Sequence, residues 1–299
     1  MTRSSRRDFL KRSLCAGAAG AFAGPLNRAA VLAAAKPGSK MKLGLVTYLW
    51  GEKWDLPTLI SNCEQSNVLG VELRTTHGHG VEPTLNAEQR AEVKKRFEDS
   101  PVVNVGIGSN ECFDHVDPEK LKAAIQAAKD FVVLSRDVGG SGVKVKPNNL
   151  HEKEGVPREQ TIEQIGKALN ELGAFGADLG QEIRLEVHGE CCLLPTMKAI
   201  MDVANHPNVG VCWNSNGQDL EGEGLEYNFN LVKDRFGATA HVRELNLDDY
   251  PYQELMDLFV KMDYSGWILL EARTKIEDPV QALTGQREVF EGMVAKAQG

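Results

Sequence analysis

The chain has 299 residues, of which 42% are hydrophobic and 25% charged, and its formal net charge is −8 at pH 7. This is an ordinary globular composition, and the length is sufficient for one large hydrophobic core. An acidic protein has no electrostatic reason to bind nucleic acid, because neutralisation of phosphates dominates the affinity of such complexes.

The first 35 residues differ from the rest of the chain in composition. Residues 4–11 place a pair of arginines before Asp-Phe-Leu-Lys, an Ala- and Gly-rich apolar stretch follows, and residues 32–35 read Leu-Ala-Ala-Ala. This order resembles a twin-arginine export signal that is cleaved after Ala35. We therefore expect residues 1–35 to be a signal peptide, residues 36–299 to form the folded domain, and the protein to be exported to the periplasm. A disordered basic arm is the alternative.

The predicted signal affects the charge of the mature chain and the expected chemistry of its cysteines. Its apolar stretch is too short and too rich in Gly for a membrane-spanning helix of about 20 residues. Because it carries six Arg or Lys and one Asp, its removal changes the net charge from −8 to −13. Five cysteines remain, an odd number whose scattered spacing does not indicate a disulfide framework. We expect free thiols, with a strained Cys191–Cys192 disulfide as the alternative.

Short apolar runs alternate with longer stretches of helical periodicity along the rest of the chain. We predict eight strands, at residues 41–50, 68–74, 102–107, 143–145, 183–188, 209–214, 241–244 and 267–271. We predict helices at residues 55–66, 86–98, 117–136, 160–179, 195–204, 226–236, 251–262 and 279–297. Strands alternating with helices indicate a parallel sheet, and eight such units over about 250 residues are typical of a single (β/α)8 TIM barrel, an α/β fold.

A doubly wound dinucleotide-binding fold is the competing architecture. The glycine-rich segment Gly139-Gly140-Ser141-Gly142 precedes a predicted strand instead of opening a helix. It therefore does not have the context of a dinucleotide-binding loop, and the closed barrel is favoured.

Four predicted strands end on a group that can bind a metal or move a proton. Glu186, Asn214, His241 and Glu271 follow one another at steps of 28, 27 and 30 residues. Each step fits one strand, one helix and two loops, so these groups should meet at the mouth of the barrel, where the carboxyl ends of its strands lie. Carboxylate, imidazole and amide oxygen together suit one divalent ion such as Mn²⁺, Mg²⁺, Co²⁺ or Zn²⁺.

Alternation along the strands adds further ionisable groups to the same faces. The groups that share a face are Arg184, Glu186 and His188; His241 and Arg243; Glu72 and Arg74; and Lys144 and Lys146. Buried charges are costly unless paired or coordinated, so these groups should neutralise one another or hold an ion. The alternative to a metal site is a set of salt bridges from Glu186 and Glu271 to Arg184, Lys146 or Arg243. Cys212 shares a face with Asn214 and is either a core residue or a further ligand.

The order Glu, Asn, His and Glu on the fifth to eighth strands resembles the xylose isomerase-like TIM barrel superfamily. Within it, the sugar phosphate isomerase/epimerase family is the most similar, over residues 41–299. The resemblance implies one divalent metal, held in that family by Glu, Asp, His and Glu. By position these residues are Glu186, Asn214, His241 and Glu271.

The chain departs from the family pattern after the sixth strand. It has Asn214-Ser215-Asn216-Gly217 where the family usually has Asp-x-x-His. An amide keeps an oxygen ligand but removes a negative charge, so we expect weaker metal binding. The histidine that often holds substrate is also missing, and His188 is a candidate to replace it.

We predict a metal-dependent isomerase or epimerase of a small sugar or keto-sugar, acting by proton transfer through an enediolate. Glu186 and Glu271 are the expected catalytic residues, which remove the proton and return it. The expected substrate-binding residues are Lys146, His188, Arg243, His79, Glu72 and Trp50. We expect a small-molecule carbohydrate as the substrate, no binding to nucleic acid and no membrane span, and the sequence leaves the presence of a homo-oligomer open.

Three other functions are compatible with the same residues. A lyase would use the site to remove a proton beside the ketone of a 3-keto-glycoside and expel the aglycone by β-elimination. A phosphodiesterase resembling endonuclease IV would need more histidine ligands and a basic groove, which the acidic mature chain does not favour. A non-catalytic carbohydrate-binding barrel is the alternative outside enzymes, and Asn214 in place of Asp favours it.

Overall fold

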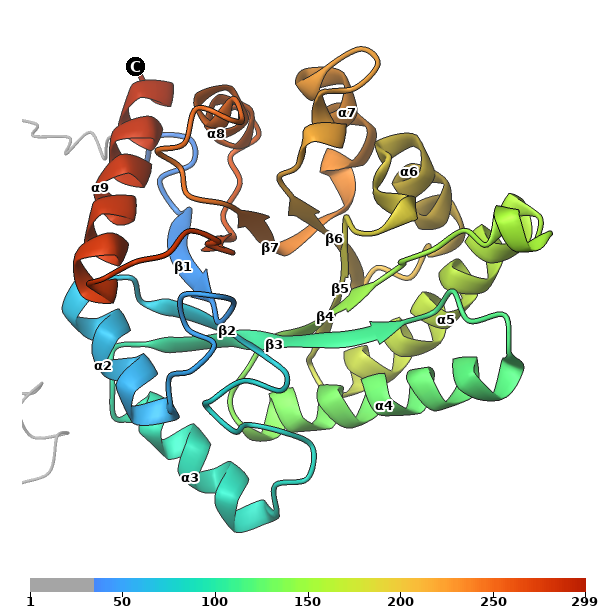
Figure 1. The fold of residues 1–299 in the computed structure, drawn as a ribbon, viewed down its shortest axis with the longest axis horizontal. Coiled ribbons are helices and arrows are strands. Elements are labelled where there is room, and N and C mark those ends of the chain that lie inside the picture. The colour runs from blue at the N-terminus through green and yellow to red at the C-terminus, as the bar shows by residue number, and fades with distance from the viewer. Residues whose placement is uncertain (1–34) are drawn as a thin grey trace, which may run out of the picture. The chain divides into compact units, whose positions relative to one another are not determined.

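The computed structural model describes residues 35–299, and eight parallel strands in it form one closed barrel in sequence order (Figure 1). Pairing of β1 with β8, from Lys42 opposite Trp267 to Leu45 opposite Leu270, closes the barrel. The predicted (β/α)8 TIM barrel is therefore confirmed. The strands are β1 (Lys42–Val46), β2 (Gly70–Arg74), β3 (Val103–Cys112), β4 (Gly142–Lys146), β5 (Glu182–Glu186), β6 (Val209–Asn214), β7 (Phe236–Val242) and β8 (Trp267–Leu270).

Helices follow the strands and surround the barrel (Figure 1). They are α2 (Leu56–Ser66), α3 (Ala87–Glu98), α4 (Pro118–Asp137), α5 (Arg158–Asp178), α6 (Leu194–Val203), α7 (Leu225–Val232), α8 (Tyr252–Lys261) and α9 (Pro279–Ala297). Short 3-10 turns are η1 (Glu152–Glu154), η2 (Glu190–Cys192), η3 (Gly217–Leu220) and η4 (Lys233–Arg235). Of the described residues, none belongs to a helix long and apolar enough to cross a membrane.

An Asp-Pro pair opens two of the predicted helices. The side chain of Asp278 accepts a hydrogen bond from the amide of Gln281 at 3.0 Å, and α9 has the predicted bounds. Asp117 accepts from the amide of Glu119 at 2.9 Å at the start of α4. An aspartate N-cap satisfies a free helical amide, and proline suits the first turn because it lacks a donor there.

The predicted bounds of α7 and β7 are wrong. The sequence predicts a helix to residue 236 and a strand from 241, whereas α7 ends at Val232 and β7 begins at Phe236. Phe236 packs on Phe229 and Phe259, with ring centroids 5.0 and 5.6 Å apart. Because Phe236 lies seven residues after Phe229, its apolar side chain continues the helical spacing although its backbone is extended.

Strand β3 is longer than predicted and continues beyond Ile107 to Cys112. Its last residues are polar but still pair with β4, with Cys112 opposite Lys146. The hydroxyl of Ser109 donates to the carbonyl of Lys144 at 2.8 Å. This extension carries Asn110 to the mouth of the barrel, beside Lys146.

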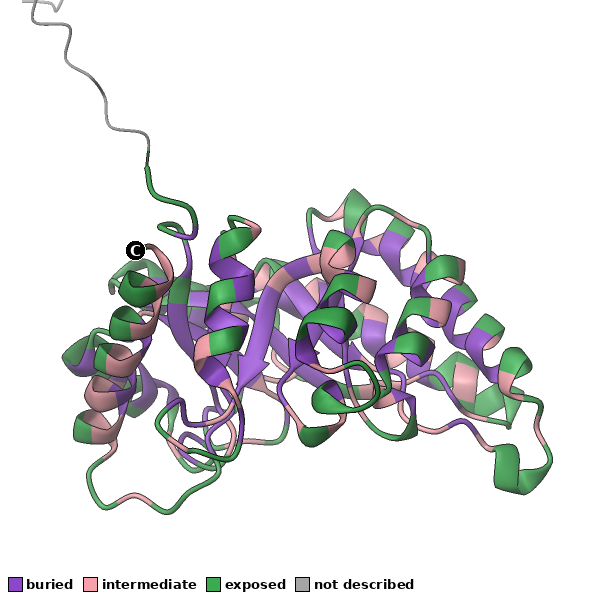
Figure 2. Ribbon diagram, turned by 90° about the horizontal axis from the view of Figure 1, so that it is seen from above, coloured by how far each residue is buried: buried purple, intermediate pink, exposed green. Residues whose placement is uncertain are grey.

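Most of the hydrophobic core lies between the barrel and its helices. Figure 2 shows the strands largely buried and the helices with alternating buried and exposed stretches. Inside the barrel the apolar cluster is small: Val46, Val105 and Leu269 are buried there, with Tyr48 and Trp267 packed against them. Charged and polar side chains therefore fill much of the lumen.

Arg184 is the largest of these buried charged side chains. Its guanidinium lies 2.7 Å from Glu182 Oε2 and donates to the carbonyl of Val105 at 3.0 Å and to Ser141 Oγ at 2.7 Å. A Cβ on Gly142 would lie only 2.9 Å from its Cζ atom, so glycine at this position makes room for the guanidinium. Arg184 thus pairs with Glu182 and not with Glu186. The salt bridge between Glu186 and Arg184, expected as one alternative to a metal site, is therefore wrong.

The cysteines between residues 35 and 299 agree with the sequence expectation. Cys63, Cys112, Cys191, Cys192 and Cys212 are free thiols. The predicted signal peptide lies outside the described residues except for Ala35 and remains a prediction.

The contact between Gly70 and Trp267 gives a stability test of the lumen packing. A Cβ on Gly70 would lie 2.3 Å from the indole ring, so Gly70→Ala should lower the free energy of unfolding by about 1–3 kcal/mol through overpacking. The control is Gly285→Ala in α9, where a Cβ meets nothing within 4 Å and should stabilise the helix by up to about 1 kcal/mol. Denaturant unfolding measures the free energy of unfolding of both variants. A Gly70→Ala variant as stable as the wild type would contradict this packing.

Candidate active site

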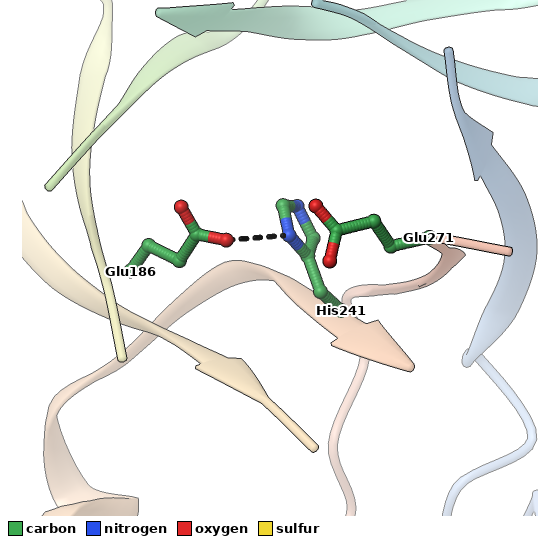
Figure 3. Close-up of side chains that lie close together, drawn as sticks. All are labelled: Glu186, His241 and Glu271. Carbon is green, nitrogen blue, oxygen red and sulfur yellow. Dashed lines mark ion pairs between the residues drawn. The ribbon is translucent and has the colours of Figure 1, made fainter. Parts of the chain in front are cut away.

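Three of the four predicted metal ligands lie together at the mouth of the barrel. Glu186 ends β5, His241 is near the end of β7 and Glu271 directly follows β8. One ligand atom from each lies within 4.8 Å of the others, and all three residues are buried. Figure 3 shows the two carboxylates on either side of the imidazole. The even spacing in the sequence reflects this convergence, because parallel strands bring their carboxyl ends to one place.

The ring of His241 lies between two carboxylates. Nε2 is 3.1 Å from Glu72 Oε1, and Nδ1 is 3.4 Å from Glu186 Oε1. Neither Nδ1 nor Nε2 has the geometry of a hydrogen bond to a described residue, so the two carboxylates contact the ring as ion-pair partners. A carboxylate on one ring nitrogen fixes the tautomer and orients the other nitrogen, as is usual for metal-ligating histidines. Glu72 is fully buried beside His241, so its position supports a role in orienting the ring, whereas the sequence predicts direct substrate binding.

The pKa values of this group reflect its charged neighbours. Burial alone lowers the pKa of His241, but the Cys212 sulfur and the Glu72 and Glu186 carboxylates outweigh it, so the pKa is raised well above its usual value. Burial alone raises the pKa of Glu186, but Lys144 and His241 outweigh it and hold the pKa well below its usual value. The pocket therefore stabilises anionic carboxylates around a centre that favours positive charge.

Lys144 is a site residue that the sequence analysis placed on the inner face of its strand without giving it a role. Its Nζ lies 2.8 Å from Glu186 Oε2, and both side chains are almost completely buried. Burial lowers the pKa of Lys144, but Glu186 and Glu72 more than compensate and raise it. A buried ammonium held in this way offsets part of the negative charge of the site.

Asn214 lies against Glu186 at the end of β6. Its Nδ2 donates to Glu186 Oε1 at 2.8 Å, and its Oδ1 accepts from Asn216 Nδ2 at 3.2 Å. An aspartate here would place a second carboxylate against Glu186, which is unfavourable without a cation between them. The amide holds this part of the site together through a hydrogen bond instead. Whether Asn214 acts as a fourth ligand stays a prediction.

Two carboxylates and an imidazole with a free Nδ1 fit a divalent ion of intermediate character. The carboxylates are not held by the salt bridges expected as the alternative, to Arg184, Lys146 or Arg243. Glu186 pairs with Lys144, and Glu271 lies 3.3 Å from the guanidinium of Arg273.

A polar cavity of about 270 Å³ opens beside these ligands. Its lining includes Tyr48, Arg74, His188, Asn214, Glu271 and Arg273. Nδ1 of His188 is buried without a hydrogen-bond partner among the described residues, and burial lowers the pKa of this histidine. A neutral imidazole with a free nitrogen can bind a ligand hydroxyl.

The other predicted substrate-binding residues lie at different distances from this cavity. Lys146 donates to Asn110 Oδ1 at 3.1 Å, and Arg243 donates to Asn216, which lines the cavity. The ring of His79 is engaged by two backbone groups, the carbonyl of Arg74 at 2.8 Å and the amide of Val81 at 3.0 Å. Trp50 donates to the carbonyl of Thr274 at 2.8 Å and lines a separate cavity of about 620 Å³.

Tyr48 and Arg273 line the cavity but were not among the predicted site residues. Both follow short strands directly in the loops at the mouth. Their positions in the sequence could have predicted this. Tyr48 lies two residues after Val46 and Arg273 two residues after Glu271, and both preceding side chains face inward at the carboxyl end of a barrel strand.

Comparison with protein families identifies the family to which this barrel belongs. Residues 60–291 match the profile of the xylose isomerase-like TIM barrel family. The chain belongs to this family. No curated protein sequence matches it.

Solved structures with the xylose isomerase-like fold are similar over most of the chain. The 3-keto-D-glucoside 4-epimerase YcjR from E. coli has a TM-score of 0.70 at 15% identity, covering 85% of this chain and 100% of its own. An L-ribulose 3-epimerase has a TM-score of 0.72 at 14% identity, covering 86% and 95%. The IOLI protein with a bound zinc atom has a TM-score of 0.71 at 16% identity, covering 86% and 99%. At these identities the likeness shows the shared fold.

Metal binding to this family member should depend on pH through His241. A histidine must lose its proton before it binds a metal, and the pKa of His241 is raised while those of Glu72 and Glu186 are lowered. Below the pKa of His241, the Kd for Mn²⁺ should therefore rise by about tenfold per pH unit. Calorimetric titration at a series of pH values measures this dependence.

Glu72→Gln is the matched variant for this titration. It removes a carboxylate that raises the pKa of His241, so the onset of the pH dependence should move to lower pH. An identical pH profile for the variant and the wild type would contradict the assigned role of Glu72.

Proposed function

We propose that the protein is a metal-dependent isomerase or epimerase of a small sugar or keto-sugar. One observation carries the proposal: Glu186 and Glu271 lie on either side of His241 at the mouth of the barrel (Figure 3), and Glu271 also lines a small polar cavity there. Two carboxylates on opposite sides of a bound substrate suit removal of a proton and its return to another face or carbon. Relatives of similar fold, at low identity, are described as sugar epimerases.

A divalent ion held by Glu186, His241 and Glu271, with Asn214 as the candidate fourth ligand, would stabilise the negative charge that develops when a C–H proton leaves beside a carbonyl. The donor set suits Mn²⁺, Mg²⁺, Co²⁺ or Zn²⁺.

The protein's own side chains position the substrate and move the proton. Lys144 keeps Glu186 ionised, so Glu186 is in the form that accepts a proton. Glu271 lines the cavity and is placed to return the proton from the other side. His188 offers a free ring nitrogen to a substrate hydroxyl, and Glu72 holds the ring of His241 in place.

Glu186→Gln and Glu271→Gln test this assignment. Each variant keeps the shape of the side chain but removes the proton-accepting group, so each should lower kcat about 10²–10⁴-fold. The control is Glu277→Gln, a carboxylate of the neighbouring cavity that should leave turnover unchanged. The assay follows exchange of substrate hydrogen with D₂O over a panel of ketoses and keto-sugars. Wild-type turnover by either site variant would rule out the proton-transfer roles.

A 3-keto-glycoside β-elimination lyase is the second candidate. The observation that favours it is the similarity in fold to an enzyme described as acting on a 3-keto-D-glucoside. Proton removal beside the ketone is shared by both reactions, but only the lyase expels the aglycone. Incubation with a 3-keto-glycoside carrying a chromogenic aglycone separates them, since release of the free aglycone indicates the lyase.

A non-catalytic carbohydrate-binding barrel is the remaining alternative, and metal analysis addresses it. Purified protein that contains no divalent metal but still binds sugar would support the binding module. We further propose that the protein acts after export by the twin-arginine route. Detection of the mature chain in the periplasmic fraction, with loss of export when the paired arginines are replaced, tests this location.

A further inference from the structure

Cationic side chains gather at the mouth of this acidic protein's barrel. Arg74 ends β2, Lys146 ends β4, Arg243 directly follows β7 and Arg273 lies just beyond β8. Within residues 35–299, Arg273 pairs with Glu271, whereas Arg74, Lys146 and Arg243 form no ion pair. Three positive charges therefore lie near the candidate active site without a carboxylate partner in the part of the chain that the structure describes.

Arg74 is the one of these three that lines the cavity. It shares the cavity wall with His188 and Glu271, so one small molecule can contact all three. Its guanidinium lies over the ring of Tyr48, with Cζ 4.7 Å from the ring centroid. Stacking uses the face of the guanidinium and fixes its plane, while the N–H donors at its edge stay available to a planar or tetrahedral anion.

Lys146 and Arg243 add positive charge close to this wall. Lys146 Nζ donates to the neutral side chain of Asn110 at 3.1 Å, and Arg243 donates to Asn216. Nε of Arg243 is buried without a hydrogen-bond partner among the described residues. Arg243 does not line the cavity, so it contributes positive charge near the wall instead of a direct contact with a ligand.

The nearby carboxylates are already engaged. Asp219, the carboxylate closest in charge effect to Arg243, accepts hydrogen bonds from the amide of Asn216 and the hydroxyl of Tyr250, both at 2.9 Å. Glu186 pairs with Lys144, Glu271 with Arg273, and Glu72 lies against His241. Glu111 lies near Lys146, but burial raises its pKa and it forms no ion pair among the described residues. Burial and then the neighbouring Lys144 lower the pKa of Lys146, Glu186 opposes this lowering, and Arg74 lowers the pKa further by a smaller effect, so these cations repel one another. An anion between them would relieve that repulsion.

We propose that the substrate of this site carries an anionic group, a carboxylate or a phosphate, which binds Arg74 at the cavity wall while Lys146 and Arg243 attract it at longer range. This inference rests on the proposed function and narrows its substrate class from sugars in general to sugar acids or sugar phosphates. The anionic group would lie at the Arg74 side of the cavity, and the carbon that exchanges its proton at the Glu271 side.

Equilibrium binding to the mature protein tests the inference with probes that differ in charge. D-Gluconate supplies a carboxylate, glucose 6-phosphate a phosphate, and D-glucose no charge. The wild type should bind at least one anionic probe about tenfold or more tightly than glucose, with affinity that falls as salt is raised. The ratio of the two anionic affinities tells the carboxylate from the phosphate source.

Arg74→Gln should lose about tenfold or more in affinity for the preferred anion and change glucose binding less than twofold. The matched control is Arg96→Gln on α3, an exposed arginine paired with Glu92, which should bind like the wild type. Equal binding of all three probes, no binding of either anion, or anion binding unaffected by Arg74→Gln would each overturn the inference.

The binding assay is independent of turnover, so the two proposals fail separately. One outcome is turnover of neutral keto-sugars that needs Glu186 and Glu271, without any preference for anionic probes. It would contradict the anionic substrate class and still support the proposed reaction. The other outcome is anion binding that depends on Arg74, with proton exchange unaffected by substitution of Glu186 or Glu271. It would support the anion site and contradict the proposed reaction.

Discussion

The site depends on a chain of buried charges that crosses the mouth of the barrel. Glu72 lies 3.1 Å from His241, His241 lies 3.4 Å from Glu186, and Glu186 lies 2.8 Å from Lys144. Each charge would be costly to bury alone, so each group holds its neighbour in place and in its charged form. The barrel allows this arrangement because only a small apolar cluster fills its lumen. The proposed function and the stability of the fold therefore depend on the same contacts.

Asparagine at position 214 changes the balance of this charge network. Its amide bonds to Glu186, and the buried ammonium of Lys144 bonds to the other carboxylate oxygen. Both groups occupy positions around the carboxylate, so a metal has to compete with groups already present. A site of this kind should hold its ion less tightly than one built with a third carboxylate. The unpaired cations at the mouth of the barrel would likewise be neutralised by the anionic group of the proposed substrate.

Much of this arrangement could be predicted from the sequence, and the rest could not for identifiable reasons. Periodicity and spacing predicted the barrel and the approach of Glu186, His241 and Glu271, because both follow from the regular repeat of strand and helix. Which charged side chains pair with each other inside the barrel could not be predicted. Arg184 reaches Glu182 and Lys144 reaches Glu186, a choice made by neighbouring strands and by the space beside Gly142. His79 and Trp50 were predicted to bind substrate, but backbone groups engage the side chains of both.

The central claim is that Glu186, His241 and Glu271 share one divalent cation. Anomalous diffraction from a crystal soaked in Mn²⁺ tests it directly. The account predicts one strong peak at about 2.0–2.3 Å from a carboxylate oxygen of each glutamate and from Nδ1 of His241. A map without a peak there, with Lys144 still on Glu186 and His241 still between its two carboxylates, would contradict it.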